Sequence, residues 1–252
     1  MKINFTKMQG CGNDYVYING FTEKIPLEKK PDFVRRMSDR HFGIGGDGVI
    51  FVNPSSLADF EMEMYNADGT RAEMCGNGIR CVAKFVYDKG LTDKTEITVE
   101  SFGQVKYLRL FTENGRVKQV RVDMGEPVLR AEEIPVVCDG EQAVAEAIEV
   151  EGRSYEMTCV SMGNPHFVTF VEDVATAPVE KVGRVIEHSS YFPERVNVEF
   201  VEIVDDNHVK FRVWERGSGE TLSCGPGACA VAYTALTLGK AGRHAQFPTV
   251  EA

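Results

Sequence analysis

The sequence predicts an α+β protein of two pseudo-symmetric domains, each with strands wrapped around a central helix, and an active site in the cleft between them. Three observations predict this fold: an internal repeat, alternating apolar segments in each half, and an apolar, helix-favouring stretch after each of two Cys-Gly-x-Gly motifs. The length of 252 residues is enough for two domains with cores of their own.

The repeat is defined first by two pairs of motifs. Gly12-Asn13-Asp14-Tyr15 resembles Gly163-Asn164-Pro165-His166, and Cys75-Gly76-Asn77-Gly78 resembles Cys224-Gly225-Pro226-Gly227. The asparagine and the cysteine are 62 residues apart in the first half and 60 residues apart in the second. Such matched spacing indicates two copies of one structural unit.

Two further landmarks lie between these motifs. Asp47 lies 28 residues before the first cysteine, and Asn197 lies 27 residues before the second. Asn66 and Glu215 each lie nine residues before the cysteine of their half. Four landmarks in one order make a chance match improbable, so we expect both halves to fold alike.

Strands are predicted where apolar and polar residues alternate. Phe60, Met62 and Met64 in the first half, and residues 209–213 in the second, follow the period of two that is typical of half-buried strands. After the first helix, residues 97–100, 105–111 and 117–122 also have the pattern of strands. We therefore place the domain boundary near residue 118, giving domains 1–118 and 119–252.

Each Cys-Gly-x-Gly motif is predicted to begin a helix. Apolar residues from Ile79 to Val86 recur at helical spacing, and the segment from Ala228 to Leu238 is apolar throughout, as in a buried helix. Gly90 and Gly239 follow as plausible C-terminal stops. Cys75 and Cys224 therefore lie at the N-terminal ends of two equivalent helices.

Composition excludes several classes of function. The formal net charge of −10 disfavours nucleic acid and anionic membrane surfaces as partners. No segment has the length and apolarity of a membrane span, and residues 1–8 lack the pattern of a signal peptide. We expect a cytoplasmic protein whose seven cysteines are free thiols. The sequence has no CxxC pair, which would indicate a zinc or redox motif.

Cysteines at helix N-termini are suited to proton transfer. The first backbone N–H groups of a helix have no partner within it, and the positive end of the helix dipole favours a thiolate or a bound carboxylate. Two such thiols, on opposite sides of one carbon, could remove a proton from one face and return a proton to the other. Cys75 and Cys224 are therefore the candidate acid–base pair.

The other cysteines are more simply explained by packing. Cys81 and Cys229 lie inside the predicted helices, and Cys138 and Cys159 match no landmark of the repeat. Cys11 precedes the first Gly-Asn motif, but the second copy has methionine at that position. We expect none of these five to be catalytic.

With these motifs in place, the sequence resembles the diaminopimelate epimerase family. The resemblance runs from the first residues to about Gly242. It implies cofactor-free interconversion of L,L- and meso-diaminopimelate, in lysine and peptidoglycan-precursor synthesis, by two domains that close over the substrate. The segments that carry it are Gly10–Tyr15, Gly43–Asp47, Asn66–Arg80, Gly163–His166, Arg195–Phe200 and Glu215–Gly225.

The resemblance also implies roles for particular residues. Backbone N–H groups around Gly76, Asn77 and Gly225 would hold the reacting carboxylate, and Glu215 would pair with the reacting ammonium. His166 and Glu215 would tune the cysteines. The residues that would line the site or hold the distal end of the substrate are Asn13, Asn66, Asn164, Asn197 and Arg216.

Two features depart from the family pattern. Pro226 stands where the family usually has threonine or serine, which removes one N–H and one hydroxyl from the carboxylate site. A lost hydrogen bond to a charged group costs about 1.5–3 kcal/mol. The family also continues past the second helix with strands, whereas this sequence ends at Ala252, so we expect a shortened or divergent end to the second domain.

Other functions stay open at this stage. A racemase of another amino acid, such as histidine or proline, would share the two-cysteine arrangement, although Arg216 with three asparagines favours a doubly zwitterionic substrate. A binding protein that lost turnover through Pro226 is a second alternative. A redox or metal function is a third, but no cluster of metal-ligating histidines is evident. A homodimer remains open, because a strand at the chain's end could pair across subunits.

Overall fold

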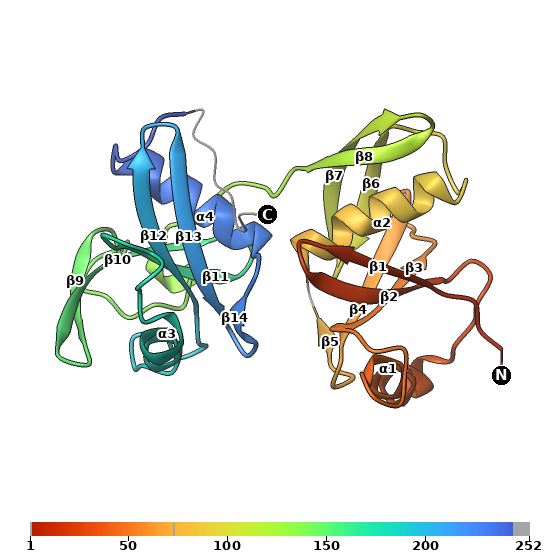
Figure 1. The fold of residues 1–252 in the computed structure, drawn as a ribbon, viewed down its shortest axis with the longest axis horizontal. Helices are drawn as coiled ribbons and strands as arrows, with labels where there is room; N and C mark the ends of the chain where they lie inside the picture. The colour runs from red at the N-terminus through yellow and green to blue at the C-terminus, as the bar shows by residue number, and fades with distance from the viewer. Residues whose placement is uncertain (1, 73, 244–252) are drawn as a thin grey trace. The chain divides into compact units, whose positions relative to one another are not determined.

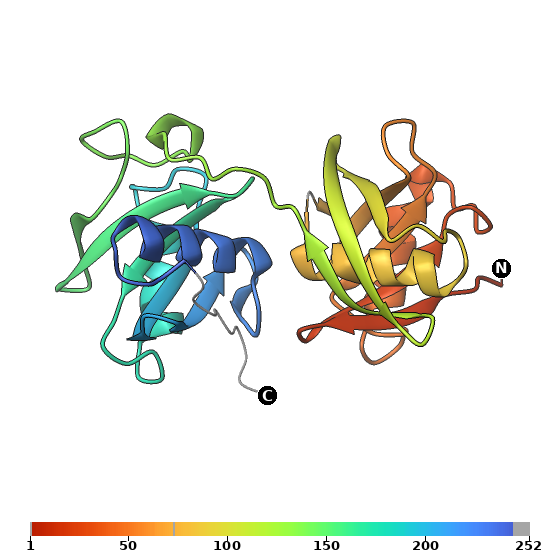
Figure 2. The same cartoon turned by 90° about the horizontal axis from the view of Figure 1, so that it is seen from above.

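The computed structural model describes residues 2–72 and 74–243, which form two compact units, Met1–Asp123 and Met124–Ala252 (Figure 1). Each unit is a sheet that curves around one long helix, with a shorter helix against the sheet (Figures 1 and 2). The α+β fold with two similar halves is therefore confirmed.

The boundary between the units differs from the predicted one. The prediction placed it at 118/119, but that position lies inside strand β8 (Arg116–Val122), and the structure divides the chain after Asp123. Strand β8 pairs with its neighbour as far as Val122, which keeps it in the first sheet.

The first unit has a sheet in the order β1-β2-β3-β4-β6-β7-β8, with β5 paired to β4. Pairs β2–β3 and β4–β6 are parallel and the others antiparallel. Besides β8, its elements are β1 (Thr6–Gly10), β2 (Asn13–Asn19), the 3-10 turn η1 (Leu27–Lys29), α1 (Lys30–Ser38), β3 (Gly48–Asn53), β4 (Phe60–Asn66), β5 (Arg71–Ala72), α2 (Gly76–Asp88), β6 (Glu96–Ser101) and β7 (Gln104–Glu113).

Strand β2 is apolar on both faces because a helix covers each face. Tyr15 and Tyr17 belong to the core that packs against α2, whereas Val16 and Ile18 belong to the core beneath α1. Alternate side chains of a strand point to opposite faces, so one continuous apolar run serves both cores.

Helix α2 is the predicted central helix of the first unit. It contacts β1, β2, β7 and β8, so strands from both ends of the sheet order lie against it. Its C-cap is Lys89, and Gly90 follows with φ +70°, a conformation that glycine adopts readily. The predicted start and stop of this helix are both confirmed.

The second unit has a sheet in the order β14-β13-β12-β11-β10-β9, in which β11 and β12 are parallel. Its elements are the 3-10 turn η2 (Ala131–Glu133), β9 (Glu146–Val150), β10 (Arg153–Ser161), β11 (Pro165–Phe170), α3 (Val179–Glu187), β12 (Asn197–Asp205), β13 (His208–Glu215), β14 (Gly219–Thr221) and α4 (Gly225–Thr237). Among the residues described, α4 is the last element, and Gly239 with φ +64° follows its end as predicted.

The two units share one chain path, because β2-α1-β3-β4-β5-α2 corresponds to β11-α3-β12-β13-β14-α4. The parallel register pairs Tyr15 with Gly48, and His166 with Asn197. The structural counterpart of Asn197 is therefore Gly48, one residue beyond the Asp47 that the repeat spacing suggested. With this correction, both positions lie 27 residues before their cysteine.

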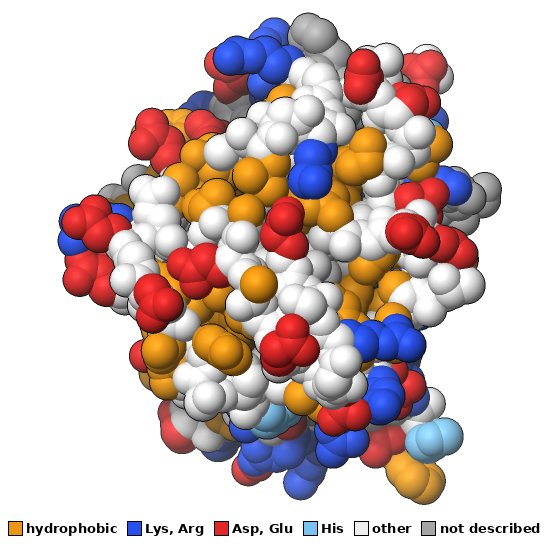
Figure 3. All heavy atoms as spheres, turned by 90° about the vertical axis from the view of Figure 1, so that its left-hand side faces the viewer, with side chains coloured by type: hydrophobic (Ala, Val, Ile, Leu, Met, Phe, Trp, Pro, Cys, Tyr) orange, Lys and Arg blue, Asp and Glu red, His pale blue; other side chains and the backbone are white. Residues whose placement is uncertain are grey.

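The expectations about the chain's end fall on residues 244–252, which lie outside the described part of the chain. Within the described residues, no helix is long and apolar enough to cross a membrane. On the face drawn in Figure 3, acidic side chains are scattered among apolar and uncharged ones, as expected for a net charge of −10.

Candidate active site

The two candidate cysteines occupy equivalent positions at the start of their helices. Cys75 is the N-cap of α2 with φ −135° and ψ 111°, and Cys224 is the N-cap of α4 with φ −120° and ψ 109°. Each Sγ accepts a hydrogen bond from the third backbone N–H of its helix, Gly78 or Gly227, at 3.3 Å in both cases. The N-terminal placement predicted from the sequence is confirmed.

The approach to each cysteine is also the same in both units. Asn66 is the last residue of β4, and Glu215 is the last residue of β13. A short returning strand follows in each case and ends shortly before the cysteine. The nine-residue spacing found in the sequence is thus the length of one hairpin that delivers the thiol to the helix start.

Around Cys75, side-chain amides form a connected network. Asn77 Nδ2 donates to Asn13 Oδ1 at 2.6 Å, and Arg80 Nη2 donates to Asn77 Oδ1 at 2.5 Å. Asn13 Nδ2 in turn donates to Asp47 Oδ2 at 3.2 Å, and the other Asp47 oxygen pairs with Arg40 Nη2 at 2.9 Å. The network fixes Asn13 and Asn77 beside the helix start.

Around Cys224 the surroundings are different. His166 Nδ1 lies 2.7 Å from Glu199 Oε1, and His166 Nε2 lies 2.9 Å from Asn164 Oδ1. One ring nitrogen of His166, one carboxylate oxygen of Glu199 and Cys224 Sγ all lie within 4.8 Å of one another. All three residues are buried, His166 and Glu199 with 0% exposure and Cys224 with 4%.

These three side chains are also of the types that ligate zinc. In the structure, however, both ring nitrogens of His166 already have hydrogen-bond partners, Glu199 and Asn164. The described geometry is that of a hydrogen-bonded polar cluster beside a thiol.

The structure gives Asn197 a supporting role. The sequence predicted that Asn197 holds the distal end of a substrate, but its side chain is buried and its amide is engaged by the backbone on both sides. Its Nδ2 donates to Pro165 O at 2.8 Å, and its Oδ1 accepts from Arg216 N–H at 2.9 Å. Asn197 therefore positions the backbone of Arg216.

Other predicted site residues have these places in the structure. Asn66 Nδ2 donates to Thr70 Oγ1 at 3.1 Å on an exposed turn, and the Thr221 hydroxyl donates to Glu215 Oε1. Gly76 and Gly225 are the first residues of α2 and α4, and Pro226 is the second residue of α4, where a missing N–H is tolerated.

Four of the remaining thiols fit the prediction of packing roles, because Cys81 and Cys159 belong to core clusters and Cys138 and Cys229 pack against such clusters. Burial raises the pKa of Cys81, of Cys159 and of Cys229, so these three remain protonated at neutral pH. Cys138 Sγ donates to Gly140 O at 3.2 Å, and Cys11 Sγ is exposed and accepts from Arg80.

Two residues of this site were missed by the sequence reasoning. Asp47 and Glu199 each stood within a segment that carries the family resemblance, and Asp47 was also a spacing landmark, but neither was given a role. The sequence did contain a signal for Glu199, which is a charged residue within the mostly apolar segment 196–201. Alternate residues of a strand share one face, so Glu199 lies on the same face as the buried Val201. Glu199 and Val201 lie on the face of β12 that packs against α4, where a buried charge needs a partner.

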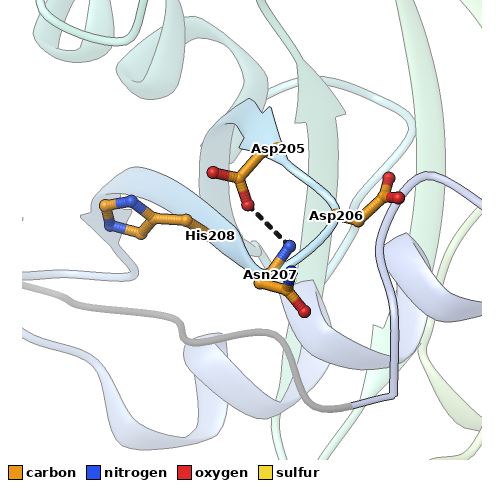
Figure 4. A pocket seen from close by; sticks show the side chains of 4 residues that line it. All are labelled: Asp205, Asp206, Asn207 and His208. Atoms are coloured by element: carbon orange, nitrogen blue, oxygen red, sulfur yellow. Dashed lines mark hydrogen bonds between the residues drawn. The ribbon is translucent and has the colours of Figure 1, made fainter.

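A separate hollow lies at the turn between β12 and β13, lined by Asp205, Asp206, Asn207 and His208 (Figure 4). Asp205 Oδ1 accepts from Asn207 N–H at 2.7 Å. Glu199 is six residues away along an extended strand, about 20 Å. This hollow is therefore distinct from the cysteine sites.

Comparison with known proteins agrees with this geometry. The family model described as diaminopimelate epimerase matches residues 5–130 and 158–250, which include both cysteines and every residue of the clusters above. The chain belongs to the diaminopimelate epimerase family.

Relatives in this family match almost the full chain. A diaminopimelate epimerase of Methanococcus maripaludis strain S2 is 53% identical over 243 residues, covering 96% of this chain and 87% of the relative. A diaminopimelate epimerase of Agathobacter rectalis is 55% identical over 241 residues, covering 93% and 84%.

Solved structures share the fold at low sequence identity. A probable proline racemase from Agrobacterium radiobacter K84 matches with a TM-score of 0.69 and 17% identity, over 95% of this chain and 78% of that chain. A hydroxyproline epimerase from Agrobacterium vitis matches with a TM-score of 0.67 and 16% identity, over 96% and 79%. The chain thus shares the fold of these two solved structures.

Proposed function

We propose that the chain interconverts L,L- and meso-diaminopimelate by moving a proton across one α-carbon, with Cys75 and Cys224 as the acid–base pair. Family membership supports the reaction. The observation that carries the assignment of the pair is their equivalence: each thiol caps a helix and accepts a hydrogen bond from the third N–H at 3.3 Å. The two cysteines also occupy matching places in the chain path that the two units share, which supports a common role.

The mechanism needs one thiolate and one thiol. The thiolate removes the α-proton from one face of the carbon, and the opposing thiol donates its proton to the other face. Each turnover exchanges the two protonation states, so the same pair serves the reverse reaction. The N-terminal end of each helix stabilises negative charge, both on a thiolate and on the substrate carboxylate during proton removal.

The reacting end of the substrate is held by the helix starts. Backbone N–H groups at Gly76, Asn77 and Gly225 are suited to bind its carboxylate, because they belong to the first turns of α2 and α4. Glu215 pairs with its ammonium group, and the Thr221 hydroxyl bound to Glu215 Oε1 orients that carboxylate.

The distal end of the substrate is a second amino acid moiety. Arg216 can bind its carboxylate through two parallel N–H donors. Asn13, Asn66 and Asn164 offer donors and acceptors without adding charge. Asn197 contributes indirectly, because its Oδ1 holds the Arg216 backbone N–H at 2.9 Å.

We place this reaction in lysine and peptidoglycan-precursor synthesis in the cytoplasm, with no cofactor, as the family resemblance implies. The proposed mechanism uses no cofactor, because both proton transfers are assigned to cysteine side chains of the protein.

The test is a stereoisomer assay on the purified, reduced protein. Starting from either L,L- or meso-diaminopimelate, chromatography should show the same equilibrium mixture, whereas histidine and proline should keep their configuration. Cys81→Ala should retain turnover, because Cys81 is a core residue of α2. If histidine or proline were racemised faster than diaminopimelate, that amino acid would be the substrate instead. Binding of diaminopimelate without turnover would indicate a binding protein.

A further inference from the structure

Glu199 is a buried carboxylate beside one of the two catalytic cysteines. It has 0% exposure and lies on the face of β12 that packs against α4, where its register partner on β13 is Val213. Its Oε1 lies 2.7 Å from His166 Nδ1, and its Oε2 has no hydrogen-bond partner among the described residues. Burying a carboxylate with one oxygen unpaired costs free energy, so its presence calls for an explanation.

Glu199 and Cys224 adjoin the same glycine. A Cβ placed on Gly227 would lie 2.6 Å from Glu199 Oε1 and 3.2 Å from Cys224 Sγ. The carboxylate therefore lies directly beside the thiol at the start of α4, within the 4.8 Å that encloses His166, Glu199 and Cys224.

The first unit has no carboxylate at the corresponding position. The register makes Ile50 the counterpart of Glu199, each two residues after Gly48 or Asn197. A Cβ placed on Gly78 would lie 2.8 Å from Ile50 Cδ1 and 3.6 Å from Cys75 Sγ. Two helix starts with the same backbone thus differ in electrostatics, because an aliphatic side chain in one is replaced by a carboxylate in the other.

We propose that Glu199 keeps Cys224 protonated in the resting enzyme, so that Cys75 is the thiolate that takes the first proton. This inference rests on the proposed function, in which the two cysteines are the acid–base pair. Glu199 acts here as a positioning residue, because it sets the protonation of Cys224 without contacting the reacting carbon.

The reason is the charge of the buried cluster. If His166 alone faced the thiol, transfer of the thiol proton to the imidazole would form a neutral ion pair. Glu199 places a carboxylate in the same buried site, and a Cys224 thiolate would add a further negative charge within 4.8 Å of it. Two like charges in one buried site disfavour ionisation of the weaker acid.

Other nearby groups do not reverse this balance. The helix N-terminus favours a thiolate at both cysteines, so the helix dipole does not distinguish the pKa of one thiol from that of the other. Cys159 on β10 stays a thiol because burial raises its pKa, and Val213 on β13 is apolar. At the positions that the register makes equivalent, the second unit has His166 and Glu199 where the first has Tyr15 and Ile50.

The test is the pH dependence of thiol modification in the free, reduced protein. A small reagent such as methyl methanethiosulfonate is applied across roughly pH 5 to 10, and peptide mass spectrometry follows Cys75 and Cys224 separately. In the unaltered protein, the midpoint for Cys75 should lie below that for Cys224. In Glu199→Gln, the Cys224 midpoint should fall by about one pH unit, which corresponds to about tenfold faster labelling of Cys224 at neutral pH. The Cys75 midpoint should stay unchanged.

The matched control is Glu202→Gln, which removes a carboxylate three residues along the same strand, where it accepts a hydrogen bond from Val174 N–H. In this variant the midpoints of Cys75 and Cys224 should both stay unchanged. A Cys224 midpoint at or below that of Cys75 in the unaltered protein would overturn the proposal without any variant. A Cys224 midpoint that is unchanged or raised in folded Glu199→Gln would also overturn it. Labelling needs no substrate, so failure of the proposed epimerisation would be seen separately, in the stereoisomer assay.

Discussion

The carboxylate of Glu199 lies in the second unit where the side chain of Ile50 lies in the first. Each adjoins the glycine that hydrogen-bonds the cysteine, at 2.6 Å and 2.8 Å from a Cβ placed on Gly227 and Gly78. The repeat thus conserves the backbone that presents two thiols while changing the side chain beside each. On the proposal made above, this difference is what distinguishes Cys224 from Cys75 in the resting protein.

Pro226→Thr should improve catalysis. Proline at the second position of α4 cannot donate a backbone hydrogen bond, whereas the matching position in α2 is Asn77. Threonine restores an N–H and a hydroxyl at the proposed carboxylate site, and one hydrogen bond to a charged group is worth about 1.5–3 kcal/mol. We expect kcat/KM for diaminopimelate to rise by about tenfold or more. Pro226→Ala, which restores the N–H alone, should give part of the gain, and an unchanged kcat/KM in both variants would remove this position from the substrate site.

Gly227→Ala should damage the second site more than Gly78→Ala damages the first. At Gly227 the new methyl would press on Glu199 Oε1, which is held by His166, and on Cys224 itself. At Gly78 it meets Ile50 Cδ1, the end of a flexible side chain. We expect Gly227→Ala to lose about 1–3 kcal/mol of unfolding free energy and most turnover, as measured by urea denaturation and the stereoisomer assay. Equal losses in the two variants would contradict the difference between the sites.

The Lys30–Glu63 pair should make the first unit sensitive to acid. Burial alone would raise the pKa of the Glu63 carboxyl, but hydrogen bonds from Lys30, Tyr65 and Asn53 hold that pKa below its usual range. A lowered pKa in the folded state contributes stability above the unfolded value of about 4.3, and this stability is lost as the pH falls through the folded pKa.

Lys30→Met tests this directly, because it leaves Glu63 buried without its cation. We expect a loss of about 3 kcal/mol or more in unfolding free energy at pH 7, and a much smaller difference from the unaltered protein once Glu63 is protonated. Lys118→Met, which breaks an exposed pair with Glu113, should cost about 0–1 kcal/mol. A Lys30→Met penalty that persists unchanged at low pH would show that the loss is one of packing.

Much of the fold could be predicted because the repeat and the strand alternation agree. The helices that follow Cys75 and Cys224, and the glycines after their ends, lie where the sequence placed them. The domain boundary was misplaced by five residues, because alternation shows that a strand exists but does not show where its last pairing partner lies.

Parts of the site required the register of the sheets. Spacing alone tolerates an offset of one residue, so Asp47 was matched to Asn197 although pairing with β2 and β11 identifies Gly48 as the counterpart. The same offset concealed the relation between Ile50 and Glu199. Asn197 is of a residue type that suits ligand contact, and only its bonds to Pro165 O and Arg216 N–H reveal a supporting role.

The central claim, that two cysteines share one proton transfer, is tested most directly by α-deuterium exchange in D2O. The unaltered, reduced protein should place deuterium on the α-carbon of the product stereoisomer. Cys75→Ala and Cys224→Ala should each lose stereoinversion by several orders of magnitude while keeping the native circular dichroism spectrum. Inversion at near-normal rates in either folded variant would contradict the two-cysteine mechanism.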